Sequence, residues 1–378
     1  MVLAQALQIL CDLIRFPSIS STSNRDISQY VADCLTPCGM RMEVLSYNDP
    51  QGVRKVNVVA TRGTGVGGLV YAAHTDVVPV EGWEYPQAGP FEPHQTADRL
   101  YGRGSCDMKG SLACFLAALL TTPLQRLRAP ITILCTADEE IGYHGAEYVA
   151  AHSEIYRDLR EQQPIVVIGE PTSLQVVHAH KGIYVFKVTS RGKAGHSSTE
   201  AGVNANLRMI PFLQEMARIY HATRDAAEWR DDRFSPPGIS WNIGINDFTQ
   251  AANITPERSV CTVSFRPMPG QDAESLVNLA RDKAEELGLT FELQHGARPV
   301  FVAPESPHIQ ELLELTGKSS SRTVAYGTDA AMFEDLRKIV ICGPGDIAQA
   351  HTVDEWIALD QMQRGIDVYR RMIERFCL

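Results

Sequence analysis

The sequence lacks the features that mark membrane, secreted and nucleic-acid-binding proteins. Among its 378 residues, no hydrophobic run approaches the roughly 18 residues that a membrane-spanning helix needs. Residues 1–10 contain no Lys or Arg, so they do not resemble a secretory signal peptide. Lys and Arg number 35 against 45 Asp and Glu, which gives a formal net charge of −10, and no basic run occurs. We therefore predict neither a membrane nor a nucleic-acid partner.

The cysteines do not form a disulfide pattern. There are nine, an odd number, and the nearest pair, Cys34 and Cys38, lacks the C-x-x-C spacing. Scattered single cysteines are typical of reduced thiols, so we expect a cytoplasmic protein. Residues 63–68 match G-x-G-x-x-G by letter, but they precede a predicted strand instead of joining a strand to a helix. A turn is therefore expected there, not a nucleotide site.

Hydrophobic residues make up 44% of the chain, and their spacing predicts alternating helices and strands. Short Val- and Ile-rich runs are typical of buried parallel strands, and longer amphipathic segments are typical of helices. This alternation predicts an α/β domain with an α/β/α arrangement and a largely parallel mixed sheet. The predicted strands lie near 54–61, 68–74, 131–137, 165–169 and 338–342, and the helices near 3–15, 25–38, 108–120, 308–317 and 360–376.

The pattern changes between about residues 181 and 296. The predicted order there is strand 183–190, helix 204–220, strands 240–248 and 258–266, helix 272–287 and strand 289–294. This β-α-β-β-α-β order predicts a ferredoxin-like α+β module inserted into the α/β domain. We expect three segments: residues 1–180 and 297–378 form the catalytic domain, and residues 181–296 form a dimerisation or lid domain.

Histidines and acids follow several predicted strands. In open α/β sheets, ligands bind beyond the carboxyl ends of the strands, so these side chains could meet at one edge. Each one alone could be an ordinary loop residue, but their joint placement favours a metal site. Such a set of imidazoles and carboxylates suits a hydrolase with two metal ions. The residues are His74 with Asp76, Asp107, the run Asp138-Glu139-Glu140, Glu170 and His351.

These motifs resemble a known family. His74-Thr-Asp76-Val-Val-Pro, Tyr101-Gly-Arg-Gly-Ser-Cys-Asp107-Met-Lys-Gly, Asp138-Glu-Glu, Gly169-Glu-Pro-Thr and Ala350-His are similar to motifs of the co-catalytic zinc amidohydrolases and exopeptidases. The resemblance covers essentially the whole chain in order, including the inserted module. It implies metal-dependent hydrolysis of an amide bond.

The resemblance also implies roles for the individual residues. Two divalent ions are expected, zinc or alternatively cobalt. Asp107 would bridge them, and the peptide bond after it would be cis. Glu139 would act as the general base on a water between the metals, and Asp76 would orient His74. The remaining ligands would be His74 and Glu170 for one metal and Glu140 and His351 for the other.

The inserted module is expected to complete the site. In Gly192-Lys-Ala-Gly-His196, the histidine resembles a lid residue that reaches the active site of a second subunit, which implies a homodimer. Taken alone, a histidine such as His196 is more often a turn residue than a catalytic one. Asn253 and Arg266 match substrate-contacting positions, although many members carry an acid where this chain has Ser264. Arg266 suits a carboxylate because its planar guanidinium can donate two parallel hydrogen bonds to the two carboxylate oxygens.

The expected substrate is a small N-acyl amino acid. Gly327-Thr328-Asp-Ala and the segment 343–351 resemble the acetyl-releasing branch of the family more than the succinyl-releasing branch. Gly327 and Thr328 are expected to line the substrate site. The prediction is conversion of N2-acetyl-L-ornithine to L-ornithine and acetate. N-succinyl-diaminopimelate, N-acetylcitrulline and dipeptides remain alternative substrates.

Overall fold

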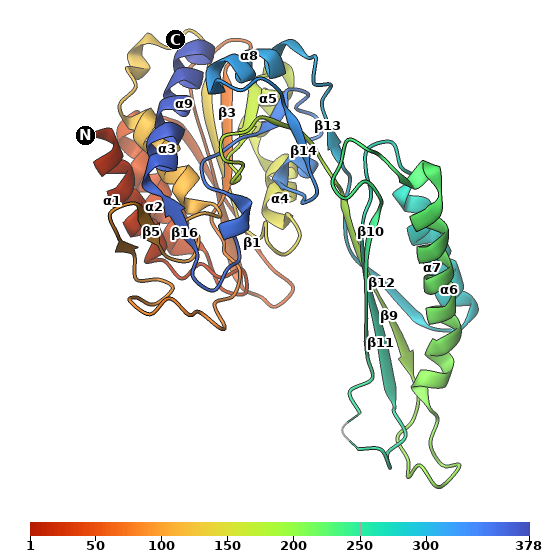
Figure 1. Ribbon diagram of the computed structural model, residues 1–378. Coiled ribbons are helices and arrows are strands. Elements are labelled where there is room, and N and C mark those ends of the chain that lie inside the picture. Colours follow the sequence, from red (N-terminus) through yellow and green to blue (C-terminus); the bar gives the residue numbers. More distant parts are fainter. Residues whose placement is uncertain (250) are drawn as a thin grey trace. The chain divides into compact units, whose positions relative to one another are not determined.

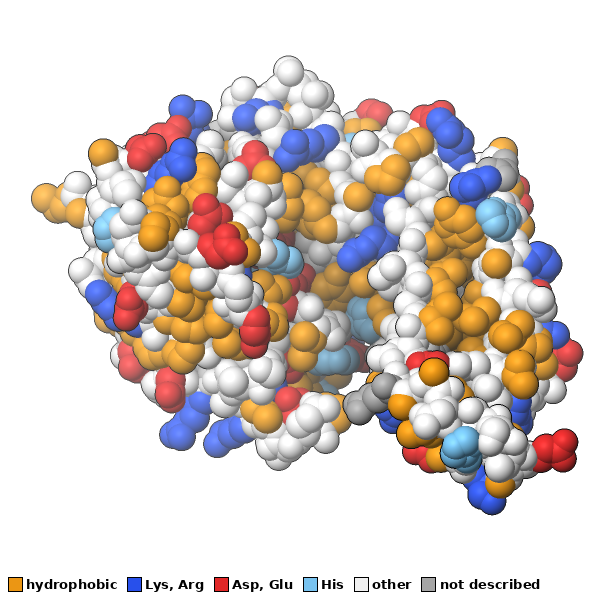
Figure 2. Space-filling model, turned by 60° about the horizontal axis from the view of Figure 1, so that its bottom comes forward, with side chains coloured by type: hydrophobic (Ala, Val, Ile, Leu, Met, Phe, Trp, Pro, Cys, Tyr) orange, Lys and Arg blue, Asp and Glu red, His pale blue; other side chains and the backbone are white. Residues whose placement is uncertain are grey.

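The computed structural model describes residues 1–249 and 251–378, and the chain forms two compact units (Figure 1). The first unit comprises Met1–Ala179, Val302–Arg322 and Thr328–Leu378, and the second His180–Phe301 and Thr323–Gly327. Among the described helices, none has both the length and the apolar character needed to cross a membrane. On the face drawn in Figure 2, Lys and Arg side chains are interspersed with acidic and hydrophobic ones.

The first unit is built on a mixed sheet. Its inner strands β6, β3, β7 and β15 pair in parallel, and each of their residues is buried. Burial on both faces explains why these strands are continuous Val- and Ile-rich runs. Antiparallel strands flank them on both sides. The order is β1 (Arg41–Asn48), β2 (Arg54–Arg62), β6 (Ile131–Thr136), β3 (Leu69–His74), β7 (Ile165–Ile168), β15 (Ile339–Ile341) and β8 (Val177–His180).

Helices cover both faces of this sheet (Figure 1). On one face, Tyr71 of β3 stacks on Phe115 with ring centroids 4.0 Å apart and meets Tyr369 edge-on at 5.3 Å. These two aromatic rings anchor helices α3 and α9 to the sheet. The helices of this face are α1 (Val2–Ile14), α2 (Arg25–Leu35), α3 (Lys109–Leu120), α8 (Pro307–Thr316) and α9 (Leu359–Cys377), and those of the other are α4 (His144–His152) and α5 (Glu154–Gln162).

The second unit is an antiparallel sheet covered by two helices. Its strands lie in the order β10 (Ser240–Asn246), β11 (Arg258–Arg266), β9 (Ile183–Arg191) and β12 (Thr290–Ala297). Helices α6 (Ala205–Asp225) and α7 (Ala273–Glu286) pack on it and form a separate hydrophobic core. The chain order and the strand order are those of a ferredoxin-like fold.

The predicted fold class is confirmed: an α/β unit is joined to a separate α+β unit. The predicted boundaries of the insertion and its role in dimerisation stay predictions. Helix α6 continues through Pro211, although a proline inside a helix commonly kinks or ends it. Short elements that were not predicted complete the structure: β4 (His94–Gln95), β5 (Arg99–Tyr101), β13 (Val300–Phe301), β14 (Arg322–Val324), β16 (Trp356–Ala358), and the 3-10 helices Thr36–Cys38, Leu124–Arg126, Ala227–Trp229, Asp329–Met332 and Ile347–Gln349.

Candidate metal centre

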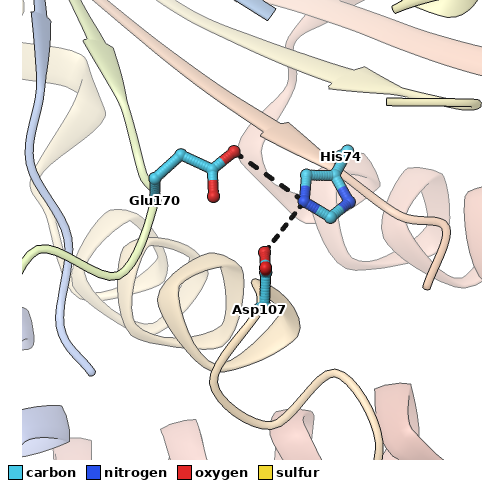
Figure 3. A group of neighbouring side chains, drawn as sticks. All are labelled: His74, Asp107 and Glu170. Atoms are coloured by element: carbon cyan, nitrogen blue, oxygen red, sulfur yellow. Dashed lines mark hydrogen bonds and ion pairs between the residues drawn. The ribbon is translucent and has the colours of Figure 1, made fainter. Parts of the chain in front are cut away.

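The carboxyl ends of neighbouring strands carry the candidate ligands, as open α/β sheets favour. His74 is the last residue of β3, and Glu170 lies two residues beyond β7, which pairs with β3. A side chain at Gly169 would clash with the Tyr71 hydroxyl and with Ser111, so only glycine fits at the residue before Glu170. Asp107 enters from the start of α3, as Figure 3 shows.

Asp107 lies between two histidines. Its Oδ1 is 3.1 Å from His74 Nε2, and its Oδ2 is 3.3 Å from His351 Nε2. The peptide bond between Asp107 and Met108 is cis, as the resemblance implies. A carboxylate that presents one oxygen to each of two imidazoles is suited to bridge two cations.

Each histidine also has a second carboxylate beside it. Glu170 Oε1 lies 3.8 Å from His74 Nε2, and the two oxygens of Glu140 lie 3.2 and 3.1 Å from His351 Nε2. The possible ligand atoms therefore fall into two groups that share Asp107, and within each group all atoms lie within 4.8 Å of one another. The first group is buried, whereas the His351 side chain is 52% exposed.

Asp76 joins this cluster to the turn that follows β6. Its Oδ1 accepts a hydrogen bond from the backbone N–H of Glu139 at 3.2 Å, and its Oδ2 accepts one from Glu140 at 3.3 Å. His74 Nδ1 lies 2.9 Å from the backbone oxygen of Asp76 and 3.7 Å from its carboxylate. The expected contact between Asp76 and His74 is therefore made chiefly by the backbone, while the carboxylate holds the two glutamates.

Buried negative charge dominates the electrostatics. Burial raises the pKa of Glu139 well above its usual range, against the influence of His74, and Glu170 and Glu140 raise it further. Burial and the charge of Asp107 likewise raise the pKa of Glu170. Despite its own burial, Asp107 has a lowered pKa because both histidines bond to it. A cation placed among these carboxylates would offset their desolvation and mutual repulsion.

The side chains fit divalent metal ions. Glu170 Oε1 is buried and accepts no hydrogen bond from the described residues, so its lone pairs are free for a ligand. The donor set of imidazole nitrogens and carboxylate oxygens is the set that zinc takes in catalytic sites. Each group offers three protein ligands, which leaves a position for water or substrate.

Glu355 supports the Asp107 loop and was not predicted from the sequence. Its Oε1 accepts hydrogen bonds from the backbone N–H of Cys106 at 2.8 Å and of Asp107 at 3.0 Å. Its Oε2 accepts from Gly104 N and from Arg103 Nη1, both at 2.9 Å. The sequence does not distinguish this buried acid from the exposed Asp354 beside it, because the partners lie about 250 residues away in the chain.

Two predicted substrate-contacting residues lie together in the second unit. The backbones of His196 and Ile254 form a β-bridge, and Ser197 N donates to Asn253 O at 3.0 Å. The His196 ring lies 2.8 Å from the hydroxyl of Ser198. His196 and Asn253 therefore lie on two paired loops, and their catalytic and binding roles stay predictions.

The other predicted substrate residues lie at element ends. Arg266 is the last residue of β11, opposite Ser240 of β10. Gly327 is the last residue of the second unit, and Thr328 begins the segment that returns to the first. Thr328 is fully buried, and its hydroxyl accepts a hydrogen bond from Ala330 N at 3.2 Å. This bond gives Thr328 a structural role as a helix cap, and its substrate contact stays a prediction.

Comparison with known proteins identifies close relatives. The sequence matches the peptidase family M20/M25/M40 over residues 70–375. It is 34% identical to acetylornithine deacetylase of Proteus mirabilis (strain HI4320), covering 98% of this chain and 97% of the relative. It is 32% identical to acetylornithine deacetylase of Myxococcus xanthus, with 97% and 96% covered.

A solved structure has the same fold. An M20 family metallo-carboxypeptidase from Sulfolobus solfataricus aligns with a TM-score of 0.77 over 98% of both chains. Its sequence identity is 18%, so this likeness concerns the fold alone.

Proposed function

The chain belongs to the peptidase family M20/M25/M40, and from this premise we propose that it is a metal-dependent deacetylase of N2-acetyl-L-ornithine. The family and the relatives make it a hydrolase of the amide bond of N-acyl amino acids. The observation that carries the proposal is Asp107, whose two carboxylate oxygens each face a different histidine. The products would be L-ornithine and acetate.

Five side chains would hold the two metal ions. When bound, the ions would polarise the substrate carbonyl and make water more acidic. Asp107 would belong to both sets of ligands. The hydrogen bond from its backbone N–H to Glu355 fixes the position of Asp107. His74 and Glu170 would complete one set of ligands, and Glu140 and His351 the other.

Glu139 would carry the proton. The residue is only 8% exposed, and its backbone N–H donates a hydrogen bond to Asp76. A carboxylate in this position can take a proton from water and pass it on. Glu139 would take a proton from water while the water oxygen adds to the amide carbon. It would then give the proton to the amine nitrogen as the C–N bond breaks.

We infer that the second unit supplies substrate contacts. Arg266 would pair with the substrate carboxylate, Asn253 would contact the substrate, and His196 would stabilise the developing oxyanion from a second subunit. The pairing of the His196 and Asn253 loops supports a joint role. The proposed action of His196 on a second subunit requires a dimer, and light scattering on the purified protein tests it. A monomeric mass in an active sample would contradict the role of His196.

Release of free amine from N2-acetyl-L-ornithine is the test of the proposed function. Activity is measured after chelation and again after zinc or cobalt is restored, with the variant Glu139→Gln purified in parallel to exclude contaminating enzymes. N2-acetyl-L-citrulline and N-succinyl-diaminopimelate are assayed beside it. We expect metal-dependent cleavage of acetyl-ornithine. Faster release from either other substrate would replace the substrate assignment, and no cleavage of any would contradict the proposed function.

A further inference from the structure

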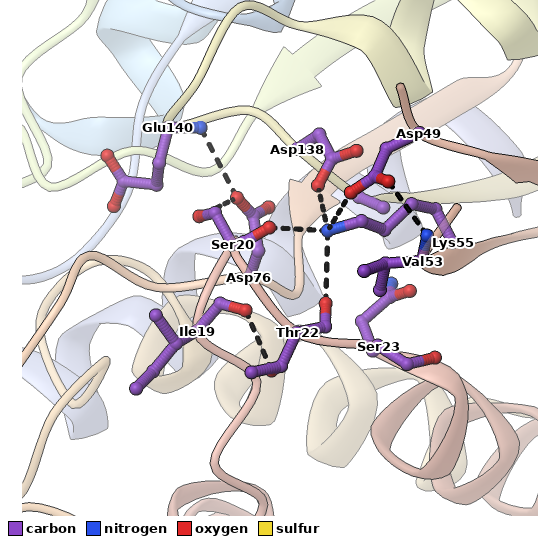
Figure 4. Close-up of polar contacts among 12 residues, drawn as sticks. Ile19, Ser20, Thr22, Ser23, Asp49, Val53, Lys55, Asp76, Asp138 and Glu140 are labelled. Atoms are coloured by element: carbon purple, nitrogen blue, oxygen red, sulfur yellow. Dashed lines mark hydrogen bonds and ion pairs between the residues drawn. The ribbon is translucent and has the colours of Figure 1, made fainter. Parts of the chain in front are cut away.

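Lys55 places a buried ammonium group beside the turn that carries Glu139 and Glu140 (Figure 4). Its side chain is 1% exposed, and its Nζ lies 2.8 Å from Asp138 Oδ1. Nζ also donates to the backbone oxygens of Thr22, at 3.0 Å, and of Ser20. Nζ therefore forms an ion pair with Asp138 and two hydrogen bonds to backbone oxygens. A lysine buried in this way is held in one position.

Strand β2 holds the turn through two side chains. Asp138 follows β6 with a φ of 58°, and its second oxygen accepts a hydrogen bond from Tyr47 Oη at 2.7 Å. Tyr47 and Lys55 are direct partners in the β1–β2 ladder. Asn57 lies two residues after Lys55 and therefore on the same face of the strand. Its Oδ1 accepts a hydrogen bond from the backbone N–H of Ala137 at 2.9 Å. The β1–β2 pair therefore fixes both residues that immediately precede Glu139.

The other side of the turn is held by Asp76, which accepts the backbone N–H groups of Glu139 and Glu140. Ser20 connects the two sides, because its hydroxyl donates to Asp76 Oδ2 at 2.7 Å while its backbone oxygen accepts from Lys55 (Figure 4). The turn is thus held from β2 on one side and from the His74–Asp76 segment on the other, through one connected polar network.

We propose that Lys55 is a positioning residue that acts through Asp138 on the Glu139–Glu140 turn, an inference that rests on the proposed function. Two adjacent glutamates must serve different purposes, one as base and one as ligand, so a small rotation of the turn displaces both. Catalytic groups require placement to within about 0.5 Å. Without the ammonium, Asp138 would add an unpaired buried charge next to the two glutamates, and their repulsion would displace the turn.

The test replaces Lys55 by methionine, which has a similar length and no charge, in the full-length protein. At saturating zinc, we expect kcat for N2-acetyl-L-ornithine to fall about 10–100-fold while KM changes little. In competition with a chelator, zinc affinity should weaken by about 10-fold, because Glu140 lies on the displaced turn. The matched control is Asp49→Asn, which alters the more distant partner of the same ammonium, at 3.7 Å. This control should keep kcat within about two-fold, because the hydrogen bonds that the Asp49 carboxylate accepts come from Gln51 N and Val53 N in the β1–β2 turn and not from residues 137–140.

A purely structural role gives a different result. Lys55→Met would then lower the unfolding temperature but keep the kcat of each metal-saturated chain and the zinc affinity, and this outcome would overturn the proposal. If Lys55→Met does not fold, Tyr47→Phe removes the hydrogen bond that Tyr47 donates to Asp138, and an unchanged kcat and zinc affinity in that variant would also overturn the proposal. If the wild type cleaves none of the substrates, the proposed function fails, while the zinc competition still tests Lys55.

Discussion

At the scale of single residues, the site depends on how Asp107 divides its two oxygens between His74 and His351. An aspartate side chain is short, so this division requires the backbone itself to approach both histidines. The hydrogen bonds from Cys106 N and Asp107 N to Glu355 fix the backbone in that place. The position of Asp107 is therefore set by a residue that is not a ligand.

Glu139→Gln tests the proposed base. The amide has nearly the same shape as the carboxylate but cannot take a proton, so kcat should fall by about 10²–10⁴-fold. Metal content, measured by elemental analysis, should be unchanged because Glu139 belongs to neither ligand group. The control is Glu147→Gln, an exposed acid on α4. A variant that keeps its full kcat would exclude Glu139 as the base.

Replacing ligands one at a time tests the bridge. His351→Ala should remove the ion held with Glu140 and leave the ion held by His74 and Glu170. Asp107→Ala should weaken both, because both groups share this residue. Titration calorimetry with zinc separates the two cases. Equal losses in the two variants would contradict the bridging role.

At the scale of elements, loops matter as much as strands. The strands place His74 and Glu170 at one edge, but Asp107 and His351 lie on segments whose course the sheet does not set. Glu355 connects these segments, because it lies four residues beyond His351 and accepts hydrogen bonds from residues 103–107. The two loops are therefore held as one piece.

Glu355→Gln should weaken the connection between the Asp107 and His351 loops. The amide nitrogen cannot accept hydrogen bonds from the backbone N–H groups. The Arg103 side chain, which is 5% exposed, also loses its charged partner. Removing one member of a buried pair costs about 3–5 kcal/mol, so the free energy of unfolding of the metal-free protein should fall by about that amount. Urea denaturation measures this loss, with the exposed Asp354→Asn as the control. Equal stability of both variants would show that Glu355 contributes no more than a surface acid.

At the scale of the whole molecule, the two units have separate cores, and the candidate ligands all belong to the first. A ligand that binds the folded state stabilises the part of the protein that holds it. Metal binding should therefore stabilise the first unit directly, and the second unit has its own hydrophobic core to hold it together.

Metal removal tests this difference. At a zinc concentration of about 100 times Kd, one bound ion adds about 2.7 kcal/mol to the stability of the unit that binds it. In calorimetry, chelation should lower the unfolding temperature of the first unit and leave a separate transition of the second unchanged. Restoring zinc should reverse the shift. An unfolding profile that chelation does not alter would contradict metal binding to the folded protein.

Much of the fold could be predicted from the sequence because its signals are local. The runs that became β3, β6 and β7 are largely apolar, as burial on both faces of a sheet requires. Strand β1 has no such run because it lies at the sheet edge and is only half-buried. Short helices such as α4 were not predicted, because nine residues carry too little periodicity to identify.

The sequence by itself predicted which residues could bind metal. For His74 and Glu170 the physical reason is that side chains at the ends of parallel strands meet at one edge of the sheet. Only the tertiary structure decided which groups hold them in place. Lys55 looks like an ordinary strand lysine, and Glu355 looks like a surface acid. Their partners are Asp138 and the backbone of Asp107, the latter 248 residues away. Such pairings depend on how distant segments pack, and local patterns of hydrophobicity carry no information about them.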